Sequence, residues 1–303
     1  MAEQYRVQFD AEVTFQNGGR LGVEAFRLDI PGTDIGDEDL AALFVRNLGL
    51  LMVGTIRIAN KRVLQQQHKG NPAALEAAVP ARRRDSIELS HAIEHGMVTY
   101  PGLPGPEISD HLTREASRSH YDAGTEFHIG RISMVANTGT YLDTPYHRLA
   151  GGADLAGVGL RSVADLEGIV VRVGDASGRA IDRDLLLPHD VRGRAVLIHT
   201  GWDRHWGAEG YGIGAPFVTR AAALWLAQEG AALVGIDSVN IDDMTDRSRP
   251  AHTTLLAAGI PIVEHLCGLE QLPVRGFRFH AAPPLVRGMG TFPVRAYAVL
   301  ETE

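Results

Sequence analysis

An eleven-residue segment from Asn137 to His147 concentrates side chains that can act as acids, bases or metal ligands. It reads N-T-G-T-Y-L-D-T-P-Y-H, so Asn137, Tyr141, Asp143 and His147 all fall on odd-numbered positions. In an extended chain alternate residues point to the same side, and these four side chains would then share a face. The pattern predicts either a polar site or a polar strand edge that ends in a turn.

Other familiar chemical motifs are missing from the sequence. It contains neither a G-x-x-x-x-G-K-[ST] loop nor a G-x-G-x-x-G turn between a strand and a helix, and it has no G-x-S-x-G nucleophile elbow. A nucleotide cofactor is therefore not expected. Cys267 is the single cysteine, which excludes an intrachain disulfide and a cysteine-based metal cluster.

The N-terminal residues predict a small ββαβ extension over residues 1–64. Apolar and polar residues alternate over residues 5–15, and an Asn-Gly-Gly turn separates them from a second strand over 21–28. An acidic stretch at 34–39 precedes the helical spacing of Leu40, Leu43 and Phe44, and residues 50–63 favour a further strand.

Residues 65–86 are typical of a linker, and a second unit follows over residues 87–303. The linker is polar and contains Pro72, Pro80 and an arginine triplet, with a short alanine-rich helix expected at 73–78. Beyond it, short β-branched runs occur near 135 and at 169–171, 195–198, 233–236 and 296–300, with an amphipathic helix over 217–229. Strands separated by single helices and long loops indicate an α/β fold.

The overall composition is that of an ordinary globular protein. Of 303 residues 45% are hydrophobic and 22% are charged, and the formal net charge is −8, which disfavours a nucleic-acid partner. The longest apolar run, residues 48–56, is too short to cross a bilayer, and the first residues lack the build of a signal peptide. We therefore expect a cytoplasmic protein that acts on a small molecule.

The segment 137–147 resembles the H-x-G-T-H-x-D-x-P-x-H signature of the cyclase family, which includes bacterial kynurenine formamidases and isatin hydrolases. Further motifs continue the resemblance in order: I-E-L-S-H at 87–91, H-T-G-W at 199–202, G-I-D-S at 235–238, H-T-T-L-L at 252–256, G-I-P-I-V-E at 259–264 and P-P-L at 283–285. The resemblance covers residues 87–301. It implies a swivelling β/β/α domain with barrel-like strands, and a homodimer or homotetramer.

The resemblance also implies a metal site, with two departures from the signature. The family's first two signature histidines are metal ligands, and Asn137 and Tyr141 stand in their places. Asp143, His252 and Glu264 are retained, and together they would hold one divalent ion, zinc or manganese. Alternatively, Glu264 pairs with an arginine and His252 caps the helix that follows it.

Three functions remain open from the sequence. The first is a metal-dependent hydrolase of a small cyclic amide, an arylformamide or a related carbonyl metabolite, with His147 as general acid or base. The second is a metal-independent cyclase, dehydratase or lyase that uses acid–base chemistry, and the third is a non-catalytic small-molecule binding protein. Tyr141 is a possible proton donor or oxyanion stabiliser, and Asn137 could orient it or bind a substrate carbonyl. The joint retention of the acidic and histidine side chains argues against the third function.

The N-terminal extension is too small to have a reliably stable core without a staple. We expect it to dock on its own C-terminal domain or on a neighbouring subunit. That contact would bury the apolar side chains of Tyr5, Val7, Phe9, Val13 and Phe15.

Overall fold

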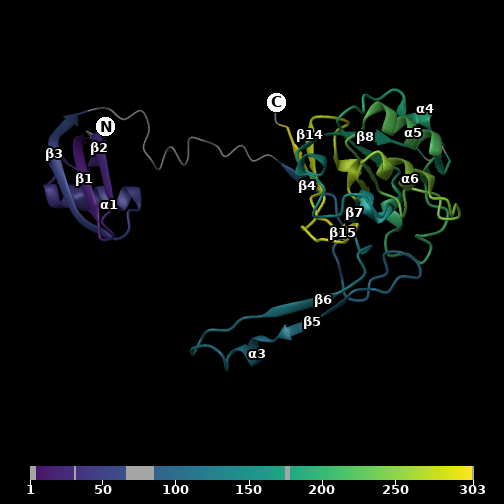
Figure 1. The fold of residues 1–303 in the computed structure, drawn as a ribbon, viewed down its shortest axis with the longest axis horizontal. Coiled ribbons are helices and arrows are strands. Elements are labelled where there is room, and N and C mark those ends of the chain that lie inside the picture. The colour runs from purple at the N-terminus through teal and green to yellow at the C-terminus, as the bar shows by residue number, and fades with distance from the viewer. Residues whose placement is uncertain (1–4, 31, 66–84, 175–177, 302–303) are drawn as a thin grey trace. The chain divides into compact units, whose positions relative to one another are not determined.

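The computed structural model describes residues 5–30, 32–65, 85–174 and 178–301. The chain divides into two compact units, Met1–Arg83 and Arg84–Glu303 (Figure 1). The alanine-rich helix expected at 73–78 lies outside the described residues. Among the described residues, no helix combines the length and the apolar character that a membrane crossing requires.

The N-terminal unit is a three-stranded antiparallel sheet with one helix. It contains β1 (Tyr5–Phe15), β2 (Arg20–Ile30), α1 (Asp37–Leu48) and β3 (Val53–Gln65), and the strand order is β2-β1-β3. Each strand predicted from the alternating pattern is therefore present. The helix begins at the acidic stretch, where carboxylates favour the positive end of the helix dipole, and it ends at Gly49 with a left-handed backbone.

Helix α1 covers the apolar face of β1 within this unit. Leu40 and Phe44 are one helical turn apart and fully buried, and they pack with Val7, Phe9 and Val13. The rings of Phe9 and Phe44 meet edge to face with centroids 5.5 Å apart. The expectation that this face needs cover from another domain or subunit is thus wrong, because the unit's own helix covers it.

The C-terminal unit is built on a nine-stranded mixed sheet whose strand order is β15-β7-β13-β12-β10-β8-β14-β16-β4. The sheet strands are β4 (Ser86–Glu88), β7 (Tyr141–Asp143), β8 (Leu166–Arg172), β10 (Ala195–His199), β12 (Leu233–Ile236), β13 (Ile262–Glu264), β14 (Phe277–His280), β15 (Thr291–Pro293) and β16 (Tyr297–Leu300). The helices are α4 (Arg183–Leu186), α5 (Arg220–Glu229) and α6 (Pro250–Ala257), with β9 (Ala180–Ile181) pairing with β11 (Phe217–Val218) beside them. Single 3₁₀ turns lie at η1 (Pro145–His147), η2 (Leu160–Ser162), η4 (Trp202–His205) and η5 (Leu269–Gln271).

The parallel strands β8, β10 and β12 form the buried centre of this sheet. Alternate residues of β8 face opposite sides: Ile169 and Val171 pack in one core with α4, α5 and α6, while Val170 packs in a second core with β14. The three helices lie together beside the sheet in Figure 1. Burial on both faces explains why these strands are continuous β-branched runs rather than alternating ones.

Two details differ from the elements expected in this unit. The helix expected over 217–229 begins at Arg220, because Thr219 accepts the backbone N–H of Ala222 as its N-cap and Phe217–Val218 form β11. Residue Val135 lies just beyond the end of β6 and belongs to no strand. A cap residue followed by a helical pattern fixes the start of a helix more sharply than hydrophobic spacing does.

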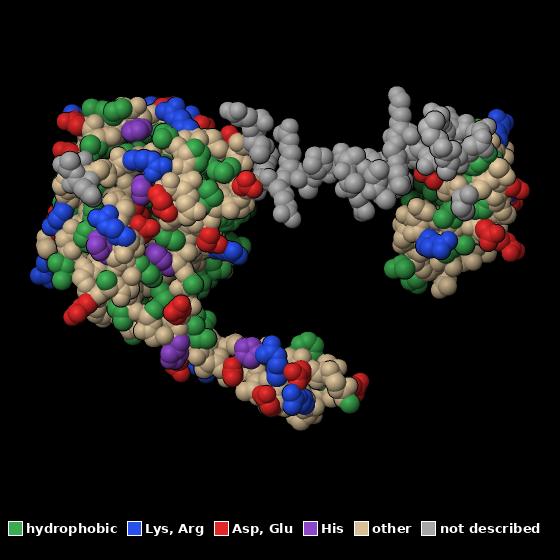
Figure 2. Space-filling model, turned by 180° about the vertical axis from the view of Figure 1, so that it is seen from behind, with side chains coloured by type: hydrophobic (Ala, Val, Ile, Leu, Met, Phe, Trp, Pro, Cys, Tyr) green, Lys and Arg blue, Asp and Glu red, His purple; other side chains and the backbone are tan. Residues whose placement is uncertain are grey.

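A two-stranded arm projects from the C-terminal unit (Figure 1). It consists of β5 (Glu107–Leu112), α3 (Arg114–Ser117) and β6 (Ile129–Ser133), and within the described part of the chain its two strands pair with each other and with no further strand. Hydrophobic side chains lie along it among charged ones (Figure 2). Every residue of β6 is exposed, including Ile129 and Ile132.

Candidate active site

Strand β7 lies between β13 and β15, and the antiparallel register of these strands assembles the site. Tyr141 stands opposite Glu264 of β13, and Asp143 stands opposite Thr291 of β15. Tyr141 and Asp143 are two residues apart on one strand, so their side chains point to the same face. Three short strands therefore bring together residues that are more than 120 positions apart in the sequence.

Glu264 is a buried carboxylate with a donor on each oxygen. The Tyr141 hydroxyl donates to Oε2 at 2.6 Å, and the backbone N–H of Ile241 donates to Oε1 at 2.6 Å. Burial, together with the neighbouring Asp143 carboxylate, raises the pKa of Glu264 above its usual range despite these donors. Burial and the same two carboxylates raise the pKa of Tyr141 well above 10, so this phenol keeps its proton.

Asp143 is fully buried and has one oxygen engaged and one free. The Thr291 hydroxyl donates to Oδ1, whereas Oδ2 has no hydrogen-bond partner among the described residues. Burial alone would raise the pKa of this carboxyl, but the His252 and His147 imidazoles and the Thr291 hydroxyl outweigh it and lower the pKa. Asp143 is therefore ionised, with an unpartnered oxygen in a dry position, which a cation would stabilise.

His252 lies in the first turn of α6 and is oriented by Asp242. Asp242 accepts the His252 ring Nδ1–H at 2.7 Å and the backbone N–H groups of Ala251 and His252 at 2.6 and 3.1 Å. Burial would lower the pKa of His252, but the carboxylates of Glu264, Asp143 and Asp242 raise it to about 10. These surroundings favour a positive charge on or beside Nε2.

The atoms around His252 Nε2 have the spacing of metal ligands. Nε2 lies 3.5 Å from Asp143 Oδ2 and 3.5 Å from Glu264 Oε1. Ligands about 2.0–2.2 Å from a tetrahedral ion are roughly 3.3–3.6 Å apart, and a carboxylate acceptor on Nδ1 is the usual support for a metal-binding histidine. The unpartnered Asp143 oxygen, the nitrogen–oxygen donor set and the distance of each carboxylate from Nε2 fit a divalent ion, whereas the side chains whose ligand atoms all lie within 4.8 Å of one another are Asp143, His147 and His252.

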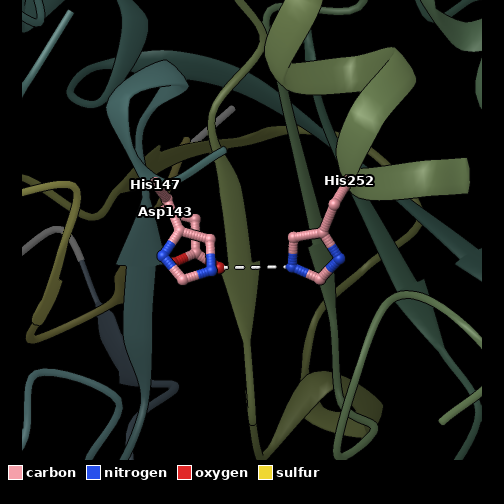
Figure 3. Close-up of side chains that lie close together, drawn as sticks. All are labelled: Asp143, His147 and His252. Carbon is pink, nitrogen blue, oxygen red and sulfur yellow. Dashed lines mark ion pairs between the residues drawn. The ribbon is translucent and has the colours of Figure 1, made fainter. Parts of the chain in front are cut away.

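His147 also lies close to this position. Ligand atoms of Asp143, His147 and His252 all lie within 4.8 Å of one another, and Figure 3 shows both imidazoles facing Asp143. His147 Nδ1 lies 2.7 Å from Thr291 Oγ1, whose single proton goes to the ionised Asp143. Thr291 must then accept the Nδ1–H of His147, and this tautomer leaves the lone pair on Nε2.

The backbone at His147 is held in place by a close approach of Gly290. An ideal Cβ on Gly290 would lie 2.3 Å from the His147 backbone nitrogen, so no larger residue fits without displacing η1. The backbone N–H and hydroxyl of Thr144 both donate to the Gly290 carbonyl. This contact fixes His147 relative to β15 and hence to Thr291.

One cavity of about 380 Å³ collects five of the six residues singled out from the sequence. Asn137, Tyr141, His147, His252 and Glu264 line it. The sixth, Asp143, is fully buried and reaches His252 from β7, as described above. The volume is in the range of small-molecule sites.

The segment that carries the motif is less extended than we expected. The strand covers only Tyr141–Asp143, Gly139 has a left-handed backbone with φ 66°, and Pro145–His147 form a 3₁₀ turn. Glu264 has no arginine partner among the described residues, so that alternative is not supported. His252 makes no cap with its side chain, and the capping carboxylate is Asp242.

Asp242 and Thr291 are two residues of the site that the sequence did not single out. Asp242 lies ten residues before His252, in a loop, and Thr291 reaches Asp143 only through the pairing of β15 with β7. Neither sits in a motif with its partner. Their roles follow from the tertiary structure.

Comparison with known families and proteins gives a consistent result. The model of the family described as "Putative cyclase" matches residues 87–243. Kynurenine formamidase of Geobacillus thermodenitrificans is 32% identical over 219 residues, covering 69% of this chain and 95% of that protein. Kynurenine formamidase of Bacillus cytotoxicus is 27% identical over 217 residues with the same coverage.

Solved structures share the fold of the C-terminal unit. The structure of a potential metal-dependent hydrolase with cyclase activity is similar with a TM-score of 0.60 and 25% identity, covering 72% of this chain and 99% of that one. Isatin hydrolase A from Ralstonia solanacearum is similar with a TM-score of 0.63 and 20% identity, covering 78% and 100%. The expected α/β, cyclase-type fold is thereby confirmed.

Proposed function

This chain belongs to the cyclase family, and from that membership we propose that it hydrolyses a C–N bond of an arylformamide or an isatin-like cyclic amide. The relatives named above include two kynurenine formamidases, and the solved structures include an isatin hydrolase. The observation that carries the proposal is the buried, unpartnered Asp143 Oδ2, which faces His252 Nε2 at 3.5 Å in a small cavity beside His147.

We propose one divalent ion, zinc or manganese, held by Asp143, His252 and Glu264. An ion held there would supply Lewis-acid polarisation of an amide carbonyl and would lower the pKa of a bound water to roughly 7. Glu264 would contribute Oε1, which lies 3.5 Å from His252 Nε2 and also accepts the Ile241 N–H. His147 is the competing third ligand, since its ligand atom lies within 4.8 Å of those of Asp143 and His252.

His147 serves as the general base and then as the general acid in this proposal. Its side chain is 35% exposed and lines the cavity, so it can reach a substrate, unlike the buried His252. The Thr291 hydroxyl accepts the Nδ1–H, which leaves Nε2 unprotonated. Nε2 takes a proton from the attacking water and returns it to the departing amine.

Tyr141 acts as a positioning residue in this proposal. It is 2% exposed, and its proton is committed to Glu264, so its hydroxyl is unsuited to shuttle protons to a substrate. Asn137 lines the cavity wall together with Tyr141. This arrangement disfavours the metal-independent acid–base alternative, in which Tyr141 would have to donate its proton.

The test is metal analysis of protein purified without a chelator or a polyhistidine tag, combined with hydrolysis of an arylformamide and of isatin. We expect one ion per chain, loss of ion and activity in Asp143→Asn, and no loss of either in Asp184→Asn, whose side chain is 84% exposed. Two ions per chain would contradict the ligand assignment. Activity with no ion would favour the acid–base alternative.

We also propose that the protein forms at least a homodimer through the arm of β5, α3 and β6. Ile108, Phe127, Ile129 and Ile132 are 43–52% exposed on this arm. A two-stranded ribbon is at best marginally stable alone, so cover by a second copy of the chain would stabilise it. Size-exclusion chromatography with light scattering tests this: a monomer at micromolar concentration, or no effect of Phe127→Ser with Ile129→Ser, would count against it.

A further inference from the structure

A loop over residues 96–106 forms part of the wall of the catalytic cavity, and its two ends are fixed to each other. The Gly96 N–H donates to the Pro106 carbonyl at 2.8 Å. Gly105 approaches Gly96 so closely that an ideal Cβ on Gly105 would lie 2.6 Å from the Gly96 carbonyl oxygen. The base of this loop is therefore held by backbone contacts, and any movement has to occur nearer its tip.

The tip of the loop is a tight turn over residues 100–103. The Leu103 N–H donates to the Tyr100 carbonyl at 3.1 Å, and Gly102 has a φ of 89°. A proline at the second position and a glycine with positive φ at the third are typical of a type II turn. All four residues of the turn line the cavity that contains the proposed catalytic residues. A shift of the turn would therefore change the shape of that cavity.

A second cavity, of about 510 Å³, borders the same loop. Val98 and Pro101 of the loop line it, together with Trp206, Tyr211 and Gly212 from the segment that follows η4. Pro101 lines both cavities. At this residue the loop is a thin wall between the catalytic cavity and the second one.

Gly212 makes a close contact with Pro101 from the side of the second cavity. An ideal Cβ on Gly212 would lie 2.8 Å from Pro101 Cγ and 3.5 Å from Pro101 Cδ. The next atom, Met244 Cε, would be at an ordinary contact distance of 3.7 Å. A side chain at position 212 therefore has one steric obstacle, the ring of Pro101, and one of these two residues would have to move.

The segment around Gly212 is held more firmly than the turn. Its neighbour Tyr211 is 5% exposed, the Tyr211 hydroxyl lies 2.8 Å from His265 Nδ1, and the Tyr211 carbonyl accepts the Trp202 Nε1–H at 2.9 Å. Pro101, by contrast, is exposed and has no backbone N–H that could anchor it. A clash at this contact is thus relieved by movement of Pro101 away from Gly212, which is toward the catalytic cavity.

We propose that Gly212 is a positioning residue that sets the width of the catalytic cavity through Pro101. This inference rests on the proposed function, because the width decides which amides the same site accepts. The absence of a side chain at position 212 allows Pro101 to lie further from the catalytic residues. A Cβ at this position would push Pro101 inward and would exclude bulky amides more strongly than small ones. Gly212 lines the second cavity, so it acts through Pro101 and not by touching the substrate.

The experiment measures kcat and KM of Gly212→Ala for a series of formanilides with hydrogen, methyl, isopropyl or tert-butyl at ring position 3 or 4. We expect kcat/KM to fall at least about tenfold for the largest amide that the wild type hydrolyses, mainly through KM. The metal content should stay that of the wild type, because the proposed ligands are not in the loop. Melting curves accompany every variant.

The matched control is Gly210→Ala in the same segment, because an ideal Cβ on Gly210 would have no atom within 4 Å. This variant should keep the kinetics of the wild type. A second comparison adds Gly212→Ala to Pro101→Ala, which lacks the Cγ and Cδ atoms of the contact. In that background Gly212→Ala should change kcat/KM less than about twofold. Unchanged kinetics in Gly212→Ala, the same loss in Gly210→Ala, or the full loss in the Pro101→Ala background would overturn the inference and leave the proposed function standing.

If no formanilide is hydrolysed, the proposed function fails, and amide hydrogen exchange decides the positioning role separately. Mass spectrometry would follow exchange in peptides that cover residues 96–106. Gly212→Ala should speed exchange there at least about threefold, because a displaced turn loses the hydrogen bond from Leu103 to Tyr100. Gly210→Ala should leave exchange unchanged. Equal exchange in Gly212→Ala and the wild type would overturn the inference.

Discussion

Replacing Tyr141 with phenylalanine removes one hydroxyl that donates to a buried carboxylate. The Tyr141 oxygen lies 2.6 Å from Glu264 Oε2, and the two side chains are 2% and 1% exposed. Water therefore cannot replace the lost donor without a rearrangement of the strands. The variant Tyr141→Phe leaves Glu264 Oε2 buried with no hydrogen-bond partner, while the ring continues to fill the same space.

The expected loss follows from the kind of hydrogen bond removed. A buried acceptor without its donor costs about 1–3 kcal/mol, more if it is charged. For a domain of 150–250 residues this lowers the melting temperature by roughly 2–12 °C. Substituting a residue that orients a metal ligand typically weakens metal binding about 10–100-fold. The rate constant kcat with saturating metal should change little, because Tyr141 transfers no proton.

The assay has three measurements on one preparation: a melting curve, a chelator competition for the metal, and kcat at saturating metal. Tyr297→Phe is the matched control, because its ring stacks on His280 and its hydroxyl has no hydrogen bond among the described residues. The control should match the wild type in all three. A loss of kcat of about 10²–10⁴-fold at saturating metal, with an unchanged melting temperature, would show that Tyr141 is an acid–base residue and refute the reasoning.

Three further predictions concern the supports of the site. Asp242→Asn should weaken metal binding about 10–100-fold in chelator competition, because it removes the carboxylate that accepts His252 Nδ1–H at 2.7 Å. Gly290→Ala should lower kcat at least about tenfold while the metal content holds, because a Cβ there would lie 2.3 Å from the His147 backbone nitrogen. Burial lowers the pKa of His265 to about 3, so only the unfolded chain takes up this proton as pH falls below about 6.5. The resulting stabilisation of the fold is complete above that pH and falls by about 2 kcal/mol at pH 5. We therefore expect His265→Asn to flatten the dependence of the melting temperature on pH between pH 7 and pH 5. A steeper dependence in this variant would contradict the sign.

The local elements could be predicted where the sequence pattern and the burial pattern agree. Residues 5–15 alternate because one face of β1 is buried under α1, and the strand has the predicted bounds. What could not be predicted is the element that covers that face, since Leu40 and Phe44 meet β1 only through tertiary packing. A period of two specifies a buried face but does not say what buries it.

The site was predictable to the extent that its residues share a motif. The resemblance named Asp143, His252 and Glu264. In the structure one oxygen of Asp143 and one oxygen of Glu264 each lie 3.5 Å from His252 Nε2. Thr291 and Asp242 were not predictable. Thr291 is 148 residues from Asp143, and its role depends on the register of β15 with β7, which no local pattern specifies. A lone aspartate in a loop likewise gives no sign that it orients an imidazole.

One departure from the family signature, Tyr141, is linked to Glu264 by the register of β7 and β13. An imidazole at position 141 could offer a lone pair to a metal ion, whereas the phenol of Tyr141 offers a proton, and that proton goes to the carboxylate directly opposite. Oε2 of Glu264 thus accepts from Tyr141, while Oε1 accepts the Ile241 N–H and lies 3.5 Å from His252 Nε2. A carboxylate divided in this way can serve one ion but not bridge two. The replacement of the signature histidine therefore changes the partner of Glu264 as well as removing a ligand, and it favours a single-ion site in which Asp143, His252 and one oxygen of Glu264 act together.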